Sequence, residues 1–250
     1  MQFGGCALAL LHEPIDTRAG GAECCQPMGD EMANQAETRL AEDAYNRILA
    51  HIMSGKLAAG AVIQEKVLVE ELGLSRTPMR DALLILEGEG LLVRESRRVV
   101  RVLSMDLSHY VENLAIRRLL ECEAAALAVG RIPEDSLDRM KAEIETLMSN
   151  HKARMPAGRE AVRRIDEELH RTIAEAAGNR QLAEIVAGLR RKTHIFDLKN
   201  MPERFLETCR EHLAIIEALR PDSEPDAARQ AMYRHINAIR ESIVRRLLQN

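Results

Sequence analysis

Four polar side chains of types that bind metals fall on or beside the apolar stripes of three predicted helices. They are one aspartate and three histidines, namely Asp166, His170, His212 and His235. Asp166 and His170 lie one helical turn apart, at the edge of the stripe in the segment GREAVRRIDEELHRTIAEAAGN. Each of the other two shares the apolar face of its own helix. We therefore expect all four to point toward one helical interior, where an unpaired charge is costly to bury.

One carboxylate and three imidazoles on facing helices form a coordination set for a borderline divalent cation such as zinc or nickel. Asp166 and His170 would supply two ligands from one helix. A single histidine on such a face is more often a core side chain with one hydrogen bond, but four such residues together favour a metal. The remaining histidines follow no such pattern and are expected to be surface or structural residues: His12, His51, His109, His151 and His194.

The elements that must position these residues are helices. The chain has 250 residues, enough for two domains with cores of their own. Aromatic residues make up only 2% of it, whereas Ala, Leu, Glu and Arg are abundant, which is typical of a mainly α protein. From Asp106 onward the pattern is wholly helical, and Pro and Gly divide it into the helices of a bundle. They are predicted over 106–129, 133–151, 158–177, 179–199, 202–219 and 225–248.

The preceding segment has a different layout. Helices are predicted from Thr38 to about Gly55, over QEKVLVEELG, and from the capping Ser75 to about Glu89. LLVR and VVRV, joined by ESRR, then predict a hairpin. Three helices followed by a two-stranded wing, in about 65 residues, are the layout of a winged helix-turn-helix.

The helix after the turn is the candidate reader of DNA. Its apolar residues fall on one arc, while Arg76, Thr77 and Arg80 share the opposite arc near its start. The positive end of the helix dipole and the free N–H groups also favour a phosphate or a groove there. The hairpin adds a local basic patch of Arg94, Arg97, Arg98 and Arg101. Together, the helices and the basic hairpin favour DNA binding over a merely solvated face.

The stretch QEKVLVEELGLSRTPMRDALLILEGEGLLV resembles the DNA-binding domain of the GntR family of bacterial transcription regulators, whose hallmark is a Ser-Arg-Thr-Pro-hydrophobic-Arg turn and helix. The resemblance covers residues 38–103. This chain has Leu84 and Ile85 where the family often has basic residues, and arginines where its wing tip is usually glycine-rich. The DNA-binding residues expected from the resemblance and the basic hairpin are Lys66, Ser75, Arg76, Thr77, Arg80, Arg97 and Arg98.

The helical half resembles the FCD effector domain of the FadR-like branch of that family, over about 106–248. DEELHRTIAEAAGN matches its Asp-x-x-x-His helix, EHLAIIEAL its Glu-His helix and RHINAI its late Arg-His helix. The resemblance implies that the aspartate and the three histidines named above are metal ligands. It also implies that Arg117, on the first helix of this half, meets the carboxylate of a bound effector.

Net charge and cysteine usage limit the setting of the protein. Residues 1–35 supply the entire net charge of −4, so acidic and basic residues balance in the remainder of the chain. Only the local distribution of charge can therefore indicate DNA binding. Five cysteines form neither a disulfide framework nor a Cys-x-x-Cys zinc pattern. No apolar run approaches the ~18 residues of a membrane helix. We therefore expect a cytoplasmic protein that does not contact a membrane.

Three domains are predicted: a disordered N-terminal extension over 1–35, a winged helix-turn-helix over 36–104, and an all-α metal-binding, effector-binding and dimerisation domain over 105–250. The preferred interpretation is a homodimeric transcription regulator, a repressor rather than an enzyme. Double-stranded operator DNA and a small organic acid would be its partners. One alternative is a metal-dependent enzyme acting on a small organic acid, since such a metal could also activate water. Another is that the bundle serves only for dimerisation.

Overall fold

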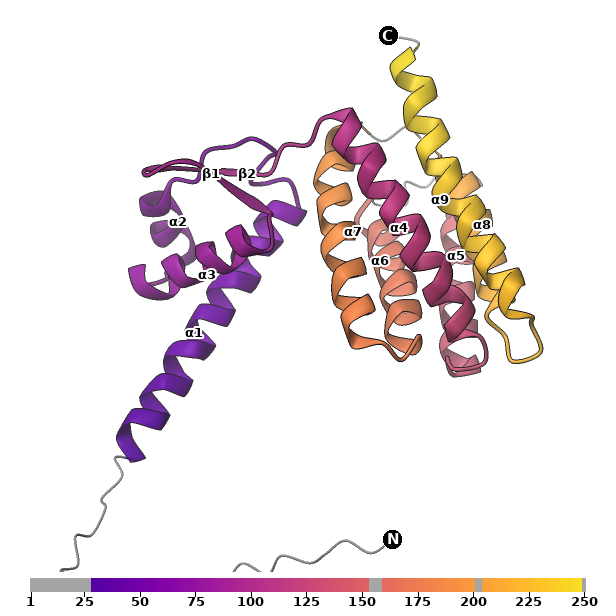
Figure 1. Cartoon of the computed structure of the whole chain (residues 1–250), viewed down its shortest axis with the longest axis horizontal. Coiled ribbons are helices and arrows are strands. Elements are labelled where there is room, and N and C mark those ends of the chain that lie inside the picture. Colours follow the sequence, from indigo (N-terminus) through magenta and orange to yellow (C-terminus); the bar gives the residue numbers. More distant parts are fainter. Residues whose placement is uncertain (1–27, 153–158, 201–203, 249–250) are drawn as a thin grey trace, which may run out of the picture.

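The computed structural model describes residues 28–152, 159–200 and 204–248. Its first part is a three-helix unit with a two-stranded sheet (Figure 1). The elements of this unit are α1 (Met28–Met53), α2 (Glu65–Leu72), α3 (Arg76–Gly88), β1 (Leu92–Ser96) and β2 (Val99–Val102). The predicted winged helix-turn-helix is therefore confirmed.

The second part is a bundle of helices, as the sequence predicts (Figure 1). Its helices are α4 (Leu107–Ala128), α5 (Glu134–Lys152), α6 (Arg159–Ala176), α7 (Arg180–Asn200), α8 (Phe205–Ala218) and α9 (Pro225–Leu248). Helix α4 packs against α6, α7 and α9, so it joins the elements that carry the candidate metal ligands to the side of the bundle that faces the winged helix.

Helix α1 begins ten residues earlier than the sequence pattern predicts, at Met28 rather than Thr38. The expectation that the N-terminal extension is disordered as far as residue 35 is therefore wrong for 28–35, whereas 1–27 lie outside the described residues. The apolar periodicity of 28–35 is weak, which is why sequence reasoning missed this part of the helix.

The turn between α2 and α3 has the backbone geometry that its residues favour. Gly73 ends α2 in the left-handed conformation, with φ of 59°. Ser75 is the N-cap of α3 as predicted, although its side chain makes no capping hydrogen bond. The wing pairs Leu92 with Val102 in antiparallel register, and an irregularity after Arg94 precedes the turn. This arrangement presents the start of α3 and the wing tip as exposed segments.

Each part has a hydrophobic core of its own. In the winged helix, Ile48, Met79 and Leu86 are fully buried between α1 and α3. In the bundle, Leu114, Leu169 and Ile216 belong to the main cluster. Burial of such aliphatic side chains supplies most of the stability of each part. Among the described residues, no helix has the length and apolar character needed to cross a membrane.

Candidate metal centre and DNA-binding surface

The predicted metal ligands come together between α6, α8 and α9. A ligand atom from each lies within 4.8 Å of those of the others, the residues being Asp166, His170, His212 and His235. His212 Nε2 approaches Asp166 Oδ1 at 3.2 Å without hydrogen-bond geometry, and the ring centroids of His212 and His235 are 4.7 Å apart. Two ligand atoms on one zinc or nickel ion, each at about 2.0–2.2 Å, are at most about 4.4 Å apart. The ligand atoms would therefore need to move only slightly closer together to bind one ion.

The three imidazoles fit a metal because each keeps one nitrogen unpaired. His170, His212 and His235 are at most 3% exposed, and their Nε2 atoms have no hydrogen-bond partner in the described part of the chain. A buried polar atom without a partner costs about 1–3 kcal/mol. Three such atoms around one carboxylate would all be satisfied by one cation.

Groups outside the cluster fix the orientation of its side chains. His170 Nδ1 is hydrogen-bonded to Glu121 of α4, and His235 Nδ1 lies 2.9 Å from Glu211 Oε2. A carboxylate needs a donor, so each Nδ1 carries the hydrogen and leaves its Nε2 lone pair directed toward the cluster. Asp166 Oδ2 accepts a hydrogen bond of 2.5 Å from Arg190 Nη2, which leaves Oδ1 for a cation.

The surroundings of the cluster favour neutral His170 and His235 and an ionised Asp166. Burial lowers the pKa of His170 to about 3, and the charge of Arg190 acts in the same direction. Burial also lowers the pKa of His235. Burial by itself would raise the pKa of Asp166, but the guanidinium of Arg190 and the neighbouring histidines hold it well below its ordinary value. Neutral imidazole and ionised carboxylate are the forms that bind metals.

Arg117 is turned into the bundle. It is 4% exposed, its Nε donates to Glu121 Oε1 at 2.5 Å, and its Nη1 donates to Thr193 Oγ1 at 3.0 Å. Since Glu121 also contacts His170, Arg117 is joined to the cluster through one carboxylate. Its charge is therefore paired within the protein.

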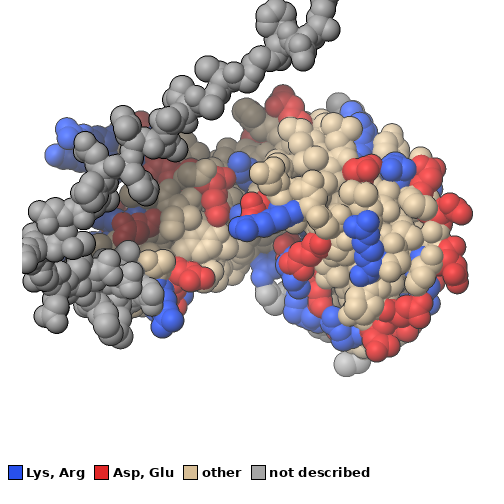
Figure 2. All heavy atoms as spheres, turned by 60° about the horizontal axis from the view of Figure 1, so that its bottom comes forward, with Lys and Arg blue, Asp and Glu red and all other residues tan. Residues whose placement is uncertain are grey.

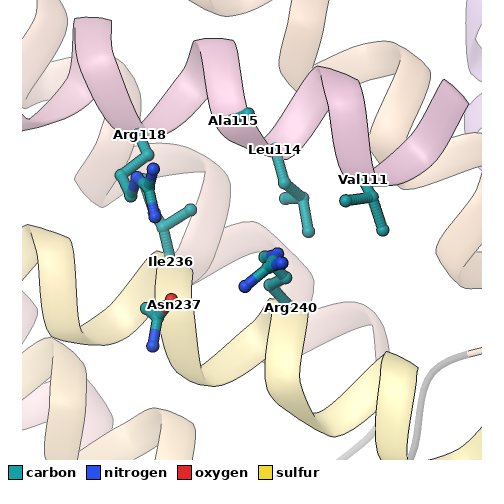
Figure 3. A pocket seen from close by; sticks show the side chains of 7 residues that line it. All are labelled: Val111, Leu114, Ala115, Arg118, Ile236, Asn237 and Arg240. Atoms are coloured by element: carbon teal, nitrogen blue, oxygen red, sulfur yellow. The ribbon is translucent and has the colours of Figure 1, made fainter. Parts of the chain in front are cut away.

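The neighbouring Arg118 points elsewhere. It lies over the ring of Tyr233 and lines a pocket of about 210 Å³ between α4 and α9 (Figure 3). Asn237 and Arg240 of α9 face it across this pocket. None of the four candidate metal ligands lines it. The pocket is therefore separate from the metal cluster.

Sequence reasoning did not identify the partners of the ligands. Glu121, Glu211 and Arg190 were not singled out as site residues, although each contacts a ligand side chain. One signal was present for Glu121, which lies four residues after Arg117 on the same helical face. Arg190 lies between the buried Val186 and Thr193 at helical spacing. Such a position indicates burial but does not show which group the arginine meets.

The predicted DNA-reading residues form an exposed group at the start of α3. Ser75, Arg76, Thr77 and Arg80 are exposed, as is Lys66 of α2, whereas the opposite face of α3 is buried. Arg80 Nε lies 3.4 Å from Glu65 Oε2, with 69% of the arginine side chain exposed. This weak, solvated pair leaves the guanidinium available for another partner.

The arginines of the wing fall into two kinds. Arg94 is paired with Glu87 at 2.6 Å and Arg101 with Glu95 at 2.7 Å. Arg97 and Arg98, at the tip, are exposed and have no ion-pair partner among the described residues. By contrast, Figure 2 shows acidic and basic side chains interspersed over the visible face of the bundle. The start of α3 and the wing tip are thus the candidate surface for phosphate and base contacts.

The remaining described histidines lie outside the cluster, as predicted. His109 and His151 are exposed, and His51 contacts Lys56 on the winged helix. His194 of α7 is different, because its Nε2 lies 3.0 Å from the backbone carbonyl of Met53 at the end of α1. It is thus a structural residue that joins the two parts of the molecule.

Comparison with models of protein families identifies the class of protein. Residues 40–102 match the model "Bacterial regulatory proteins, gntR family", and residues 112–238 match that of the FCD domain. The chain belongs to the GntR family. It is a DNA-binding transcription regulator with an FCD domain, and the resemblance seen in the sequence is confirmed.

Curated relatives that align with this GntR protein over most of their length are named as transcription regulators. It is 26% identical over 196 residues to the HTH-type transcriptional regulator YdhC of Bacillus subtilis, covering 77% of this chain and 86% of YdhC. It is 24% identical over 210 residues to the HTH-type transcriptional repressor RspR of Escherichia coli, covering 81% and 88%. These relationships overturn the alternative of a metal-dependent enzyme.

Solved structures share the fold of this GntR protein. E. coli McbR/YncC superposes with a TM-score of 0.70 at 21% identity, covering 83% of this chain and 98% of McbR. A GntR regulator from Rhodococcus sp. RHA1 superposes with a TM-score of 0.65 at 19% identity, covering 84% and 98%. At these identities the likeness concerns the fold alone. The mainly α class, with a winged helix before an all-α bundle, is confirmed.

Proposed function

We propose that the protein is a homodimeric repressor whose affinity for its operator is controlled by a small carboxylate bound at a metal in the FCD domain. The observation that carries this proposal is the convergence of three unpaired, buried Nε2 atoms on Asp166. Such a centre, in a chain that also presents a DNA-reading helix, suits a sensor. Repression is favoured because the relative RspR is named a repressor. Operator DNA lies in the bacterial cytoplasm, so the protein acts there.

The start of α3 would read bases in the major groove, and the wing would contact phosphates. The residues assigned to this interface are Lys66, Ser75, Arg76, Thr77, Arg80, Arg97 and Arg98. What supports the assignment is the exposure of Ser75, Arg76, Thr77 and Arg80 at the start of α3, a helix whose opposite face is buried. Lys66 on α2 and the two arginines of the wing tip are exposed as well. Arginine pairs well with guanine edges, so Arg76 and Arg80 are expected to carry sequence preference.

The metal would be zinc or nickel, held by Asp166, His170, His212 and His235. Imidazole nitrogen and carboxylate oxygen suit these borderline cations. Four ligands from the protein leave one or two positions on an ion that accepts five or six. A carboxylate with a neighbouring hydroxyl, as in a hydroxy acid or sugar acid, could fill two positions.

The charge around the centre explains why an acid is the favoured effector. Among the side chains that are at least partly buried, three carboxylates face three guanidiniums in and around the cluster: Asp166, Glu121 and Glu211 with Arg190, Arg117 and Arg204. Glu167, which also approaches Arg190, is 52% exposed and is screened by solvent. With neutral histidines this set is balanced, so a divalent cation adds uncompensated positive charge to a buried region. An anion restores the balance. Arg117, joined to the cluster through Glu121, is the residue assigned to meet the distal end of the acid.

The outer face of α4 is the surface we assign to the second copy. Ile116 and Leu119 are 48% and 70% exposed, and Leu127 continues the same side of the helix. Large apolar side chains clustered on an exposed face are typical of an interface. A second copy is the occupant that a pseudo-palindromic operator would require. Sedimentation of Leu119→Glu should show monomers at concentrations where the natural protein is dimeric.

The test of regulation is a titration of operator binding. Fluorescence anisotropy with DNA from upstream of the protein's own gene would be measured against a panel of hydroxy and sugar acids, with zinc bound and again after chelation. We expect one acid to weaken operator binding by tenfold or more, roughly within the usual range of allosteric coupling. The change should require zinc, and Arg117→Gln should blunt it while leaving DNA affinity without the acid intact.

Two outcomes would contradict the proposal. An acid that acts equally well on the chelated protein would place the effector site away from Asp166 and the histidines. Full metal occupancy in each of His170→Ala, His212→Ala and His235→Ala would show that these are core histidines and not ligands.

A further inference from the structure

Helix α7 completes the cores of both parts of the molecule with consecutive side chains. Ile195 is 1% exposed and belongs to the hydrophobic cluster of the winged helix. The next residue, Phe196, belongs to the bundle cluster and stacks on Tyr110, with ring centroids 4.1 Å apart. Figure 1 shows α7 on the side of the bundle that faces the winged helix. A movement of α7 would therefore change the packing of both cores.

Polar contacts surround Ile195 and tie the same two parts together. Arg191 Nη2 of α7 lies 3.2 Å from Glu89 Oε2, at the end of α3. Tyr45 of α1 donates its hydroxyl hydrogen to the same carboxylate at 3.0 Å. One acidic side chain thus links α1, the end of α3 and α7.

The end of α1 is held by two further side chains of the bundle. The carbonyl of Met53, the last residue of α1, accepts a hydrogen bond of 2.5 Å from Arg163 Nη1 of α6 and lies 3.0 Å from His194 Nε2 of α7. Carbonyls at a helix end lack intrahelical partners and attract positive charge. We call these contacts the α6–α7 clamp, comprising Tyr45, Met53, Glu89, Arg163, Arg191, His194 and Ile195.

The helices of the clamp are also the helices of the metal centre. Arg163 precedes Asp166 by three residues on α6, and Arg190 directly precedes Arg191 on α7. Arg190 bonds Asp166 across the two helices at 2.5 Å. Its Nε is buried and has no partner in the described part of the chain, although the residue is only 6% exposed. Arg190 therefore has a donor left for an anion that enters beside the metal.

We propose that Arg190 and the α6–α7 clamp fix the position of the winged helix according to the occupancy of the metal centre. A cation on Asp166 Oδ1 offsets part of the negative charge that attracts Arg190 to Oδ2, so binding changes the attraction between α6 and α7. Because a helix turn moves as a unit, a shift of Arg190 is passed to Arg191 and His194. This inference rests on the proposed metal site and names the residues that would carry its effect to the DNA-binding part.

The experiment is hydrogen exchange of the full chain, first stripped by a chelator and then saturated with Zn²⁺. The reporting amides are those of Ser54 and Gly55, after α1, and of Gly90 and Leu91, after α3, all of which are hydrogen-bonded. We expect Zn²⁺ to slow their exchange by about fivefold or more, as allosteric coupling of the usual strength would. DNA takes no part in this measurement, so it is independent of operator binding.

Arg191→Met and Arg190→Met should lose the slowing at these amides while Zn²⁺ still slows exchange within α6 at saturation. Arg190→Lys should not restore it, because the compact ammonium lacks the rigid, planar fork of donors with which the guanidinium meets its partners. The matched control is Arg180→Met, at the exposed start of the same helix, where the arginine pairs only with Glu184 among the described residues. It should behave as the natural protein.

Two results would overturn the inference. If Zn²⁺ slows exchange within α6 but not at the four reporting amides, the clamp does not sense the metal, and the proposed metal site stands without it. If Arg191→Met retains the full slowing, transmission does not pass through the clamp. A chain that binds no Zn²⁺ would overturn this inference together with the metal site, while leaving operator binding as a separate question.

Discussion

Arg80 is the side chain on which sequence-specific recognition is expected to depend most directly. It is exposed at the start of α3, and within the described part of the chain its side chain meets only Glu65, in a solvated contact. Loss of a bidentate base contact costs about 1–3 kcal/mol, so Arg80→Ala should weaken operator binding by about five- to 150-fold. Anisotropy titrations should show this loss for the operator and a much smaller one for unrelated DNA.

The control for Arg80→Ala is Arg171→Ala, at another exposed arginine, which lies on the bundle and pairs with Glu175. Both substitutions should leave the unfolding free energy within about 0.5 kcal/mol of the natural value, as exposed positions usually do. A footprint unchanged by Arg80→Ala would remove α3 as the reading helix.

His194 should give the protein a component of acid sensitivity. Burial lowers its pKa below the ordinary value, and Arg163 adds to this, although the Met53 carbonyl, Asp166 and Glu167 act in the opposite direction. Below about pH 6.5 the unfolded chain therefore takes up a proton that the folded chain does not, so this contribution to stability falls as pH falls. The loss amounts to about 1.4 kcal/mol for each pKa unit of difference.

The measurement is urea unfolding of the chelated protein at several pH values between about 7.5 and 5, where the ordinary histidine pKa of about 6.5 lies within the range. His194→Gln, which keeps a donor for the Met53 carbonyl, should lose less stability over this range than the natural protein. Parallel curves for the two would mean that His194 titrates alike in the folded and unfolded chains.

The grouping of the candidate ligand side chains could be predicted from the sequence, whereas their hydrogen-bond partners could not. Asp166 and His170 share one helix, so their spacing alone places them together. Glu121 and Arg190 reach the cluster from α4 and α7, and no local pattern states which helices pack side by side. Pairing across helices is decided by tertiary packing and becomes visible only in the fold.

Among the elements, the wing makes a contribution to DNA binding that differs in kind from that of α3. Its tip presents Arg97 and Arg98 without carboxylate partners among the described residues. If each neutralises one phosphate, Arg97→Gln and Arg98→Gln should weaken binding to all sequences and reduce the slope of log affinity against log salt by about 0.9 each. Titrations at several salt concentrations would measure this slope.

Arg94→Gln is the control within the same wing. Its guanidinium makes hydrogen bonds of 2.6–3.1 Å to Glu87 and is not free to meet a phosphate. The slope should therefore stay unchanged for this variant. Equal slopes for all three variants and the natural protein would show that the wing does not touch the DNA backbone.

Most element boundaries could be predicted because apolar periodicity and caps mark them. α4 begins after Asp106, whose side chain accepts a hydrogen bond from His109, close to the predicted start. The beginning of α1 was missed because residues 28–37 show little apolar periodicity. A helix without an apolar stripe leaves no signal of the kind on which such predictions depend.

At the scale of the molecule, metal binding should appear as folding stability. An ion at 100 times its dissociation constant adds about 2.7 kcal/mol to the unfolding free energy, provided that it binds only the folded chain. For a chain of this size we expect chelation to lower the melting temperature by roughly 5–10 °C. Differential scanning calorimetry with and without a chelator would measure it.

His212→Ala should abolish the effect of the chelator, since it removes one ligand of the cluster. His109→Ala, at an exposed position outside the cluster, should retain it in full. A natural protein whose melting temperature ignores both chelator and added zinc would contradict the metal centre.

The side chains at positions 195 and 196 complete the cores of two different parts of the molecule. A winged helix transplanted from another family member would therefore need a cavity in its core that accommodates Ile195. It would also need an acidic residue at the position of Glu89 to pair with Arg191. Chimaeras joined between β2 and α4 should consequently fail to respond to effectors more often than they fail to fold. Single substitutions on α3 can change the operator sequence that is recognised without disturbing these contacts of Ile195 and Glu89. They are therefore the easier route by which new regulators of this kind could diverge.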